Sequence, residues 1–141
     1  MIPEREFFTD DTLVMMGLSR KQGSFSRHVY NAFRKAGLKV FPVNINDSGA
    51  DNKKIFNDIT KIESVPKAAY VLMKKENAGR AYEDLKKAGI KKIMFHSKGL
   101  VDPQILTDCK ENGIETAFGC PMMIFGGGIH KFHKFLAGLF K

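Results

Sequence analysis

The chain has 141 residues, a length that fits one domain, and its 23 basic against 15 acidic residues give a net charge of +8. No apolar run reaches the ~18 residues that a membrane-spanning helix needs, which excludes an integral membrane protein built on such helices. The acidic N-terminus lacks the basic start of a secretory signal, and two cysteines are too few for a disulfide framework or a four-cysteine zinc site, so we expect a cytoplasmic protein.

Strand-like and helix-like segments alternate along the chain. The strands are expected at 13–16, 39–43, 68–73, 92–95 and 114–118, and their continuous apolar character is typical of parallel strands buried on both faces. The helices are expected over 24–36, over 77–88 and from Pro103 to about Asn112, the last capped by Asp102. Three glycines are predicted to end these helices: Gly37, Gly89 and Gly113. The alternation predicts a three-layer α/β domain with helices on both faces of the sheet.

The remaining segments complete a single domain over residues 1–141. Residues 1–11 form an N-terminal extension, and between 47 and 66 we expect one short helical turn packed on an edge of the sheet, around Ile55, Phe56 and Ile59. The C-terminal residues 126–141 are predicted to be a glycine-rich joint followed by an amphipathic helix.

The turn after the first strand is the strongest candidate for a binding site. In an open parallel sheet, ligands bind beyond the carboxyl ends of the strands, where the strand order reverses. Gly17 leaves the first strand without a Cβ, so the backbone can approach a phosphate, and Ser24 is a candidate N-cap for the following helix. The stretch from Thr12 to Asn46 has no acidic residue, which favours an anionic ligand over the alternative of an ordinary glycine turn.

The same turn departs from the usual dinucleotide pattern. Gly17 and Gly23 are six residues apart, and Ser19 stands where the second glycine of G-x-G-x-x-G would be. Asn44 follows the second strand, where an NAD site usually has a carboxylate for the ribose. These differences favour a phosphate-rich adenine nucleotide without a nicotinamide, such as coenzyme A.

The stretch GLSRKQGSFSRHVYNAFRKAGLKVFPVN, residues 17–44, resembles the CoA-binding domain proteins, which are similar to the N-terminal domain of the succinyl-CoA synthetase α subunit. The resemblance also includes AGIKKIMF at 88–95, CKENGIE at 109–115 and CPMM at 120–123. It implies a Rossmann-like sheet of about five parallel strands in the order 3-2-1-4-5, and a ligand that is coenzyme A or an acyl-CoA. The sequence departs from the family in having Lys74-Lys75 after the third strand and Ile45 after Asn44, where the family has prolines.

The resemblance and the strand ends together give the residues expected to contact the ligand. They are Gly17, Leu18, Ser19, Arg20, Gly23, Ser24, Phe25, Pro42, Val43, Asn44, Met73, Lys74, His96 and Lys98. No catalytic triad, paired acids, Walker loop or metal site can be assembled, so we expect a binding protein and not an enzyme.

Two other functions remain open at this point. One is an NAD(P)-binding redox sensor or minimal oxidoreductase. The other is a basic interaction protein whose C-terminal helix meets a membrane or a nucleic acid, although no RNA-stacking motif is present and no nucleic-acid partner is expected. A homodimer through the C-terminal helix is a secondary expectation.

The C-terminal helix, Ile129 to Phe140, has an apolar stripe that must be buried against another surface, and we predict that it packs on its own domain. Deletion of residues 129–141 should therefore lower the melting temperature, and the full-length protein should not sediment with anionic liposomes. An unchanged melting temperature, together with sedimentation of the full-length form, would contradict this prediction.

Overall fold

The computed structural model describes residues 12–18, 25–44, 55–56 and 58–119. Five parallel strands form one sheet, and they are β1 Thr12–Met16, β2 Lys39–Val43, β3 Ala68–Val71, β4 Lys92–Phe95 and β5 Glu115–Phe118. Every residue of β3 is buried, as are four of the five residues of β1, whereas β2 and β5 lie at the edges and are less buried. The predicted α/β class and all five strands are confirmed.

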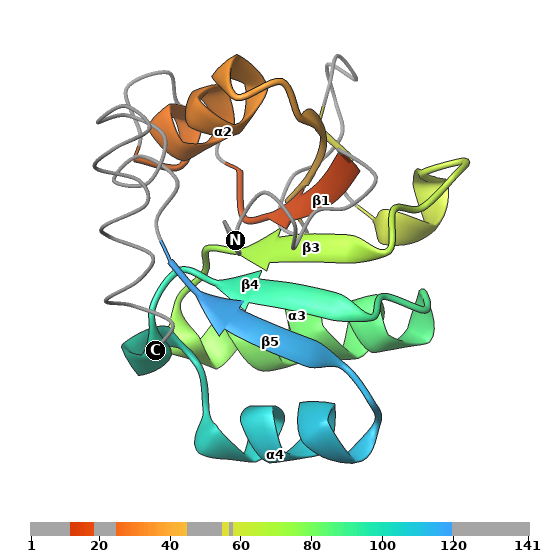
Figure 1. Ribbon diagram of the computed structural model, residues 1–141, viewed down its shortest axis with the longest axis vertical. Coiled ribbons are helices and arrows are strands. Elements are labelled where there is room, and N and C mark those ends of the chain that lie inside the picture. The colour runs from red at the N-terminus through yellow and green to blue at the C-terminus, as the bar shows by residue number, and fades with distance from the viewer. Residues whose placement is uncertain (1–11, 19–24, 45–54, 57, 120–141) are drawn as a thin grey trace.

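The strand order is β2-β1-β3-β4-β5, and the predicted order 3-2-1-4-5 is wrong in the position of the third strand. That order would place the strand at the sheet edge outside β2. In the structure β3 lies between β1 and β4 (Figure 1). The physical reason is the composition of β3, because a strand of four buried residues needs neighbours on both sides and cover on both faces.

Among the described residues, Phe56 alone occupies the place outside β2 that the prediction gave to the third strand. Phe56 forms an isolated parallel bridge with Val43, in which the Phe56 amide donates to the Pro42 carbonyl at 2.9 Å and the Phe56 carbonyl accepts from the Asn44 amide at 2.8 Å. The chain then turns at once into a short 3₁₀ helix, η1 Ile59–Lys61, whose N-cap Asp58 accepts from the Thr60 amide. The expected helical turn is therefore present, but it begins after Phe56 and not with it.

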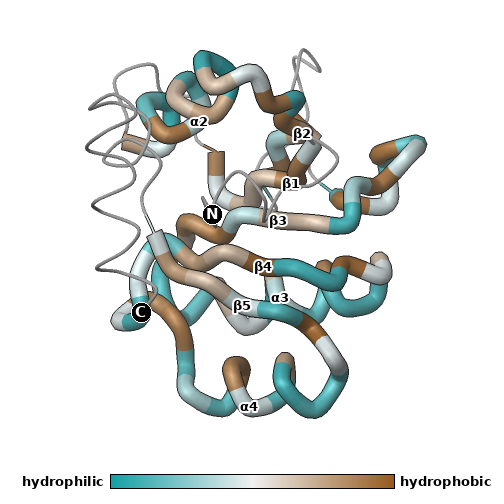
Figure 2. Tube along the Cα trace, in the orientation of Figure 1, coloured by the Kyte–Doolittle hydropathy of each residue, from teal (hydrophilic) through white to brown (hydrophobic). Residues whose placement is uncertain are grey.

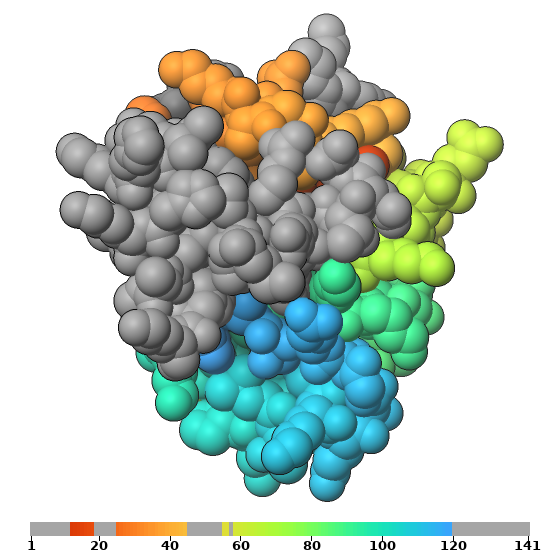
Figure 3. Space-filling view, viewed as in Figure 1, coloured from red at the N-terminus to blue at the C-terminus, as the bar shows by residue number. Residues whose placement is uncertain are grey.

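Helices cover both faces of the sheet, as predicted. Helix α2 Phe25–Lys35 packs with Leu13, Met15 and Tyr70 on one face. Helices α3 Lys75–Lys87 and α4 Pro103–Glu111 cover the other face, which includes Val14, Val71 and Ile93. Figure 1 shows α3 crossing behind the strands. In the surface view of Figure 3, α2 lies at the top of the molecule, with β5 and α4 at the bottom.

The predicted helix ends are confirmed. Gly37, Gly89 and Gly113 have φ values of 90°, 86° and 70°, in the left-handed region that glycine adopts without strain. Asp102 caps α4 by accepting from the Gln104 amide, with Pro103 in the first turn. Gly37 leads to Lys39 at the start of β2 and Gly89 to Lys91 and Lys92 at the start of β4, where the tube is hydrophilic (Figure 2).

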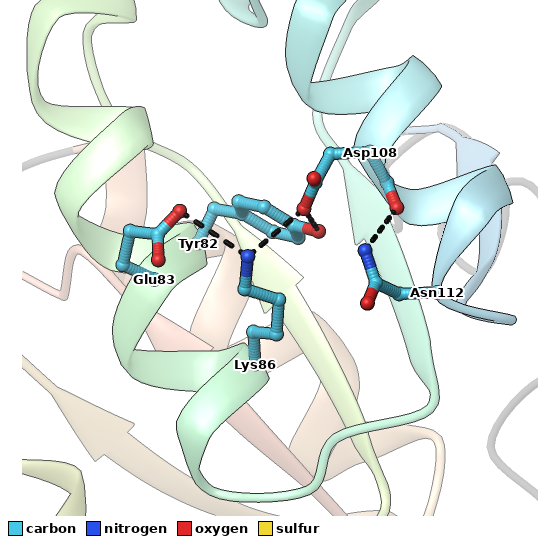
Figure 4. Close-up of polar contacts among 5 residues, drawn as sticks. All are labelled: Tyr82, Glu83, Lys86, Asp108 and Asn112. Atoms are coloured by element: carbon cyan, nitrogen blue, oxygen red, sulfur yellow. Dashed lines mark hydrogen bonds and ion pairs between the residues drawn. The ribbon is translucent and has the colours of Figure 1, made fainter.

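A polar cluster joins α3 to α4 outside the sheet (Figure 4). The Tyr82 hydroxyl donates to a carboxylate oxygen of Asp108, and the same oxygen lies 3.0 Å from Lys86 Nζ. Asn112 donates to the Asp108 carbonyl at 2.8 Å, and Glu83 lies 3.6 Å from the Lys86 ammonium. The hydrogen bond from Tyr82 and the nearby Lys86 charge lower the pKa of Asp108, while burial and the Asp108 contact raise the pKa of Tyr82.

The carboxyl end of β1 lies unusually close to that of β3. Gly17 follows β1 with a φ of 107°, and its amide donates to the Val43 carbonyl at 2.8 Å. A Cβ at this position would lie 2.1 Å from the Leu72 carbonyl oxygen and 3.0 Å from Met73 Cγ. The first contact is with backbone that is itself held in place, because the Leu72 amide donates to the Met16 carbonyl at 3.1 Å. Only glycine fits this position.

We predict that replacing Gly17 by alanine destabilises the fold by on the order of 3 kcal/mol, because the substitution combines a left-handed φ with a backbone clash. Gly79 in α3 is the matched control, since a Cβ there meets nothing within 4 Å. Gly79→Ala should stabilise the protein by about 0.5–1 kcal/mol. Urea unfolding of both variants measures the difference, and equal stabilities would contradict the close approach.

We also predict that Tyr82→Phe lowers the free energy of unfolding by about 1 kcal/mol, because the Asp108 carboxylate loses a buried donor.

Asp108→Asn should lower the melting temperature at neutral pH. Because the folded pKa of Asp108 lies below its unfolded value of 3.8, this stabilisation is present above that pH and is lost as the pH falls through the folded pKa. The melting temperatures of wild type and Asp108→Asn should thus converge as the pH falls below 3.8 and through the folded pKa, whereas the exposed control Glu83→Gln should differ little at any pH.

Candidate functional site

The candidate site lies at the carboxyl edge of the sheet, where the strand order reverses. From β1 the chain crosses to β2 on one side, and β3 then lies on the other side of β1. Doubly wound sheets of this order bind ligands at the junction of their first and third strands. Gly17 and Leu18 stand at this junction, which agrees with the position that the sequence predicted.

Asn44 holds the first turn against the end of β2. Its side-chain amide donates to the Leu18 carbonyl at 2.9 Å, and its backbone amide donates to Phe56. Leu18 itself is buried in the core under α2, so any contact that it makes with a ligand comes from its backbone. Asn44 therefore shapes the turn from the position where an NAD site would carry a carboxylate.

A tyrosine that the sequence analysis did not single out connects the other strands of this edge. The Tyr70 hydroxyl in β3 donates to the Gly119 carbonyl, which follows β5, at 3.0 Å. The same hydroxyl lies 2.7 Å from Nδ1 of His96, the residue after β4. The sequence did contain a signal for this contact, which is a tyrosine in a strand of otherwise small apolar residues. The hydroxyl of a buried tyrosine needs a hydrogen-bond partner.

Phe25 and His96 are 71 positions apart in the sequence, but they lie together in the structure. Their rings meet edge to face with centroids 5.3 Å apart, and Phe25, the first residue of α2, is 48% exposed. His96 is half-buried, and this burial lowers its pKa. The imidazole is therefore neutral at pH 7 and can accept a hydrogen bond.

The other predicted residues are placed in different ways. Pro42 and Val43 are buried, and the Val43 side chain belongs to the core. Met73 is partly buried beside Gly17, whereas Lys74 and Lys98 are exposed at the starts of α3 and of the 3₁₀ helix η2 Lys98–Leu100. Ser19, Arg20, Gly23 and Ser24 lie outside the described residues, as do residues 1–11 and 126–141.

The structure resembles solved proteins of the same architecture. The Thermus thermophilus protein cell-free ID.343 has a TM-score of 0.73 at 16% identity, covering 87% of this chain and 93% of its own. Prb, the PH1109 protein redesigned for binding, has a TM-score of 0.72 at 22% identity, with 95% and 89% covered. A hypothetical protein from Pyrococcus horikoshii OT3 has a TM-score of 0.71 at 17% identity, with 97% and 89% covered. At these identities the likeness shows the Rossmann-like fold alone.

The sequence shows the family to which the chain belongs. No curated protein matches the chain. Among the described residues, no helix is long and apolar enough to cross a membrane. The CoA binding domain matches residues 11–125, which include all five strands and the whole carboxyl edge. The chain therefore belongs to the CoA-binding domain family.

Proposed function

We propose that the protein binds coenzyme A or an acyl-CoA at the carboxyl edge of its sheet and does so without catalysing a reaction. The main support for the proposal is the family match over residues 11–125, which includes all five strands and the loops that follow them at that edge. The ligand's phosphates would lie at the turn after β1, and its remaining parts would extend over the ends of β2, β3 and β4.

Charge supports a phosphate-bearing ligand at this turn. Helix α2 has no acidic residue in its first turn and carries Arg27 there. Arg27 and Arg34 lie 6.0 Å and 5.5 Å from the centre of the Tyr30 ring, so both guanidinium groups are held along the helix. Arg27 is in the first turn, and a helix start with a basic group beside it favours anions, whereas Arg34 adds its charge in the last turn.

The end of β2 supports coenzyme A over NAD. Asn44 stands where NAD sites hold the ribose with a carboxylate, and its amide is used to hold the first turn at Leu18. No carboxylate therefore comes from this position.

Among the described residues, the edge shows no nucleophile paired with a base. His96 is hydrogen-bonded to Tyr70, and Cys109 is buried in α4, where burial raises the pKa of its thiol and disfavours the reactive thiolate. This arrangement supports binding without catalysis.

We expect isothermal titration calorimetry to show tighter binding of coenzyme A or acetyl-CoA than of NAD. Acetyl-CoA incubated with the protein should be recovered unchanged by chromatography. Equal or tighter binding of NAD would contradict the proposed ligand, and protein-dependent loss of the acetyl group would contradict the non-catalytic role.

A further inference from the structure

The Tyr70 hydroxyl fixes which nitrogen of His96 carries the proton. The hydroxyl has one proton, and among the described residues it makes two hydrogen bonds, to the Gly119 carbonyl at 3.0 Å and to His96 Nδ1 at 2.7 Å. A carbonyl oxygen can only accept, so the arrangement that satisfies both contacts has Tyr70 donating to Gly119 and accepting from Nδ1–H of His96. In the neutral imidazole this leaves a lone pair on Nε2.

The Nε2 atom lies on the side of the ring away from Tyr70. Within the part of the chain that the structure describes, the only hydrogen bond of the His96 side chain is the one to Tyr70. A half-buried acceptor of this kind is completed by water or by a ligand. The exposed ring of Phe25 lies beside it, so the neighbouring surface is aromatic.

Uncharged groups contact the imidazole on each side. They are the Tyr70 hydroxyl of β3, the Gly119 carbonyl that Tyr70 also binds, and the Phe25 ring of α2. The charged or titratable residues nearest in sequence on these elements and their loops are Arg27 and His28 in α2, Lys74 after β3 and Lys98 after β4. None of them is an acid that would favour a protonated imidazole, and the next acids along these segments, Glu76 in α3 and Asp102 before α4, are exposed.

We propose that His96 is a specificity-determining residue of the CoA site, whose Nε2 accepts a hydrogen bond from an N–H or S–H group of the uncharged pantetheine arm. Tyr70 is the positioning residue that holds the imidazole in the accepting tautomer. The inference rests on the proposed function. The arm fits this position because its amides and thiol are neutral donors on an apolar chain, whereas phosphates only accept and suit the basic turn after β1.

The assignment has a consequence for pH. Protonation of His96 places a hydrogen on Nε2 and turns the acceptor into a donor, so the contact with the arm is lost as the pH falls through the pKa of His96. The nucleotide half of the ligand does not use this contact, and its binding does not depend on His96.

Calorimetry with two ligands and two variants tests the proposal. The ligands are coenzyme A and adenosine 3′,5′-bisphosphate, which lacks the arm. His96→Phe keeps an aromatic ring beside Phe25 and removes the acceptor, so it should weaken binding of coenzyme A about fivefold and leave the bisphosphate unchanged. His96→Gln keeps an acceptor that does not titrate, and it should bind coenzyme A nearly as tightly as wild type.

The same titrations at about pH 8 and at a pH below the His96 pKa, as read from NMR, separate the His96 effect from ionisation of the ligand. The ratio of wild-type to variant affinity cancels the titration of the ligand's phosphates, and for coenzyme A this ratio should fall toward one at the lower pH. An unchanged affinity of His96→Phe for coenzyme A, or an equal loss for both ligands, would overturn the assignment. Failure of wild type to bind either ligand would instead overturn the proposed function itself.

Nitrogen-15 NMR of the imidazole tests the role of Tyr70 without relying on affinity. Wild type should show a proton on Nδ1, and Tyr70→Phe should shift the tautomer toward a proton on Nε2. A wild-type spectrum with the proton on Nε2 would overturn the positioning role even if the Tyr70→Phe protein failed to fold. An unchanged tautomer in a folded Tyr70→Phe variant would do so as well.

Discussion

The close approach of β1 and β3 at Gly17 is the constraint on which the rest of the structure depends. The Leu72 carbonyl occupies the space that a side chain at Gly17 would need. This close approach lies between the ends of β1 and β3, where the strand order reverses, and doubly wound sheets bind ligands at that point. Gly17 thus serves the packing of the sheet, and the phosphate site that we propose lies at the same turn.

Two polar side chains extend this constraint across the carboxyl edge. Asn44 ties the first turn to the end of β2, and Tyr70 ties β3 to the residues that follow β4 and β5. Each bond joins strands that are distant in sequence, so the edge is held from both sides of the reversal point.

The polar cluster of α3 and α4 has a different role. Tyr82, Lys86 and Asp108 join two helices over the face of the sheet opposite α2, whereas His96 and Phe25 meet on the α2 side. Stability of the α3–α4 layer and chemistry at the ligand edge therefore rest on separate groups. Changes in one should be close to additive with changes in the other.

The sequence by itself determined the α/β class, the five strands, the capped start of α4 and the three glycine helix ends, because each follows from local periodicity or from a backbone conformation that few residues adopt. It also singled out Gly17 and Asn44, which lie at the candidate site in the structure. Only the tertiary structure decided the position of β3, since a one-residue bridge at Phe56 took the outer place and periodicity cannot detect a strand so short. The partnership of Tyr70 with His96 was likewise hidden, because hydrogen bonds between strand ends depend on register and strand order, which no local pattern contains.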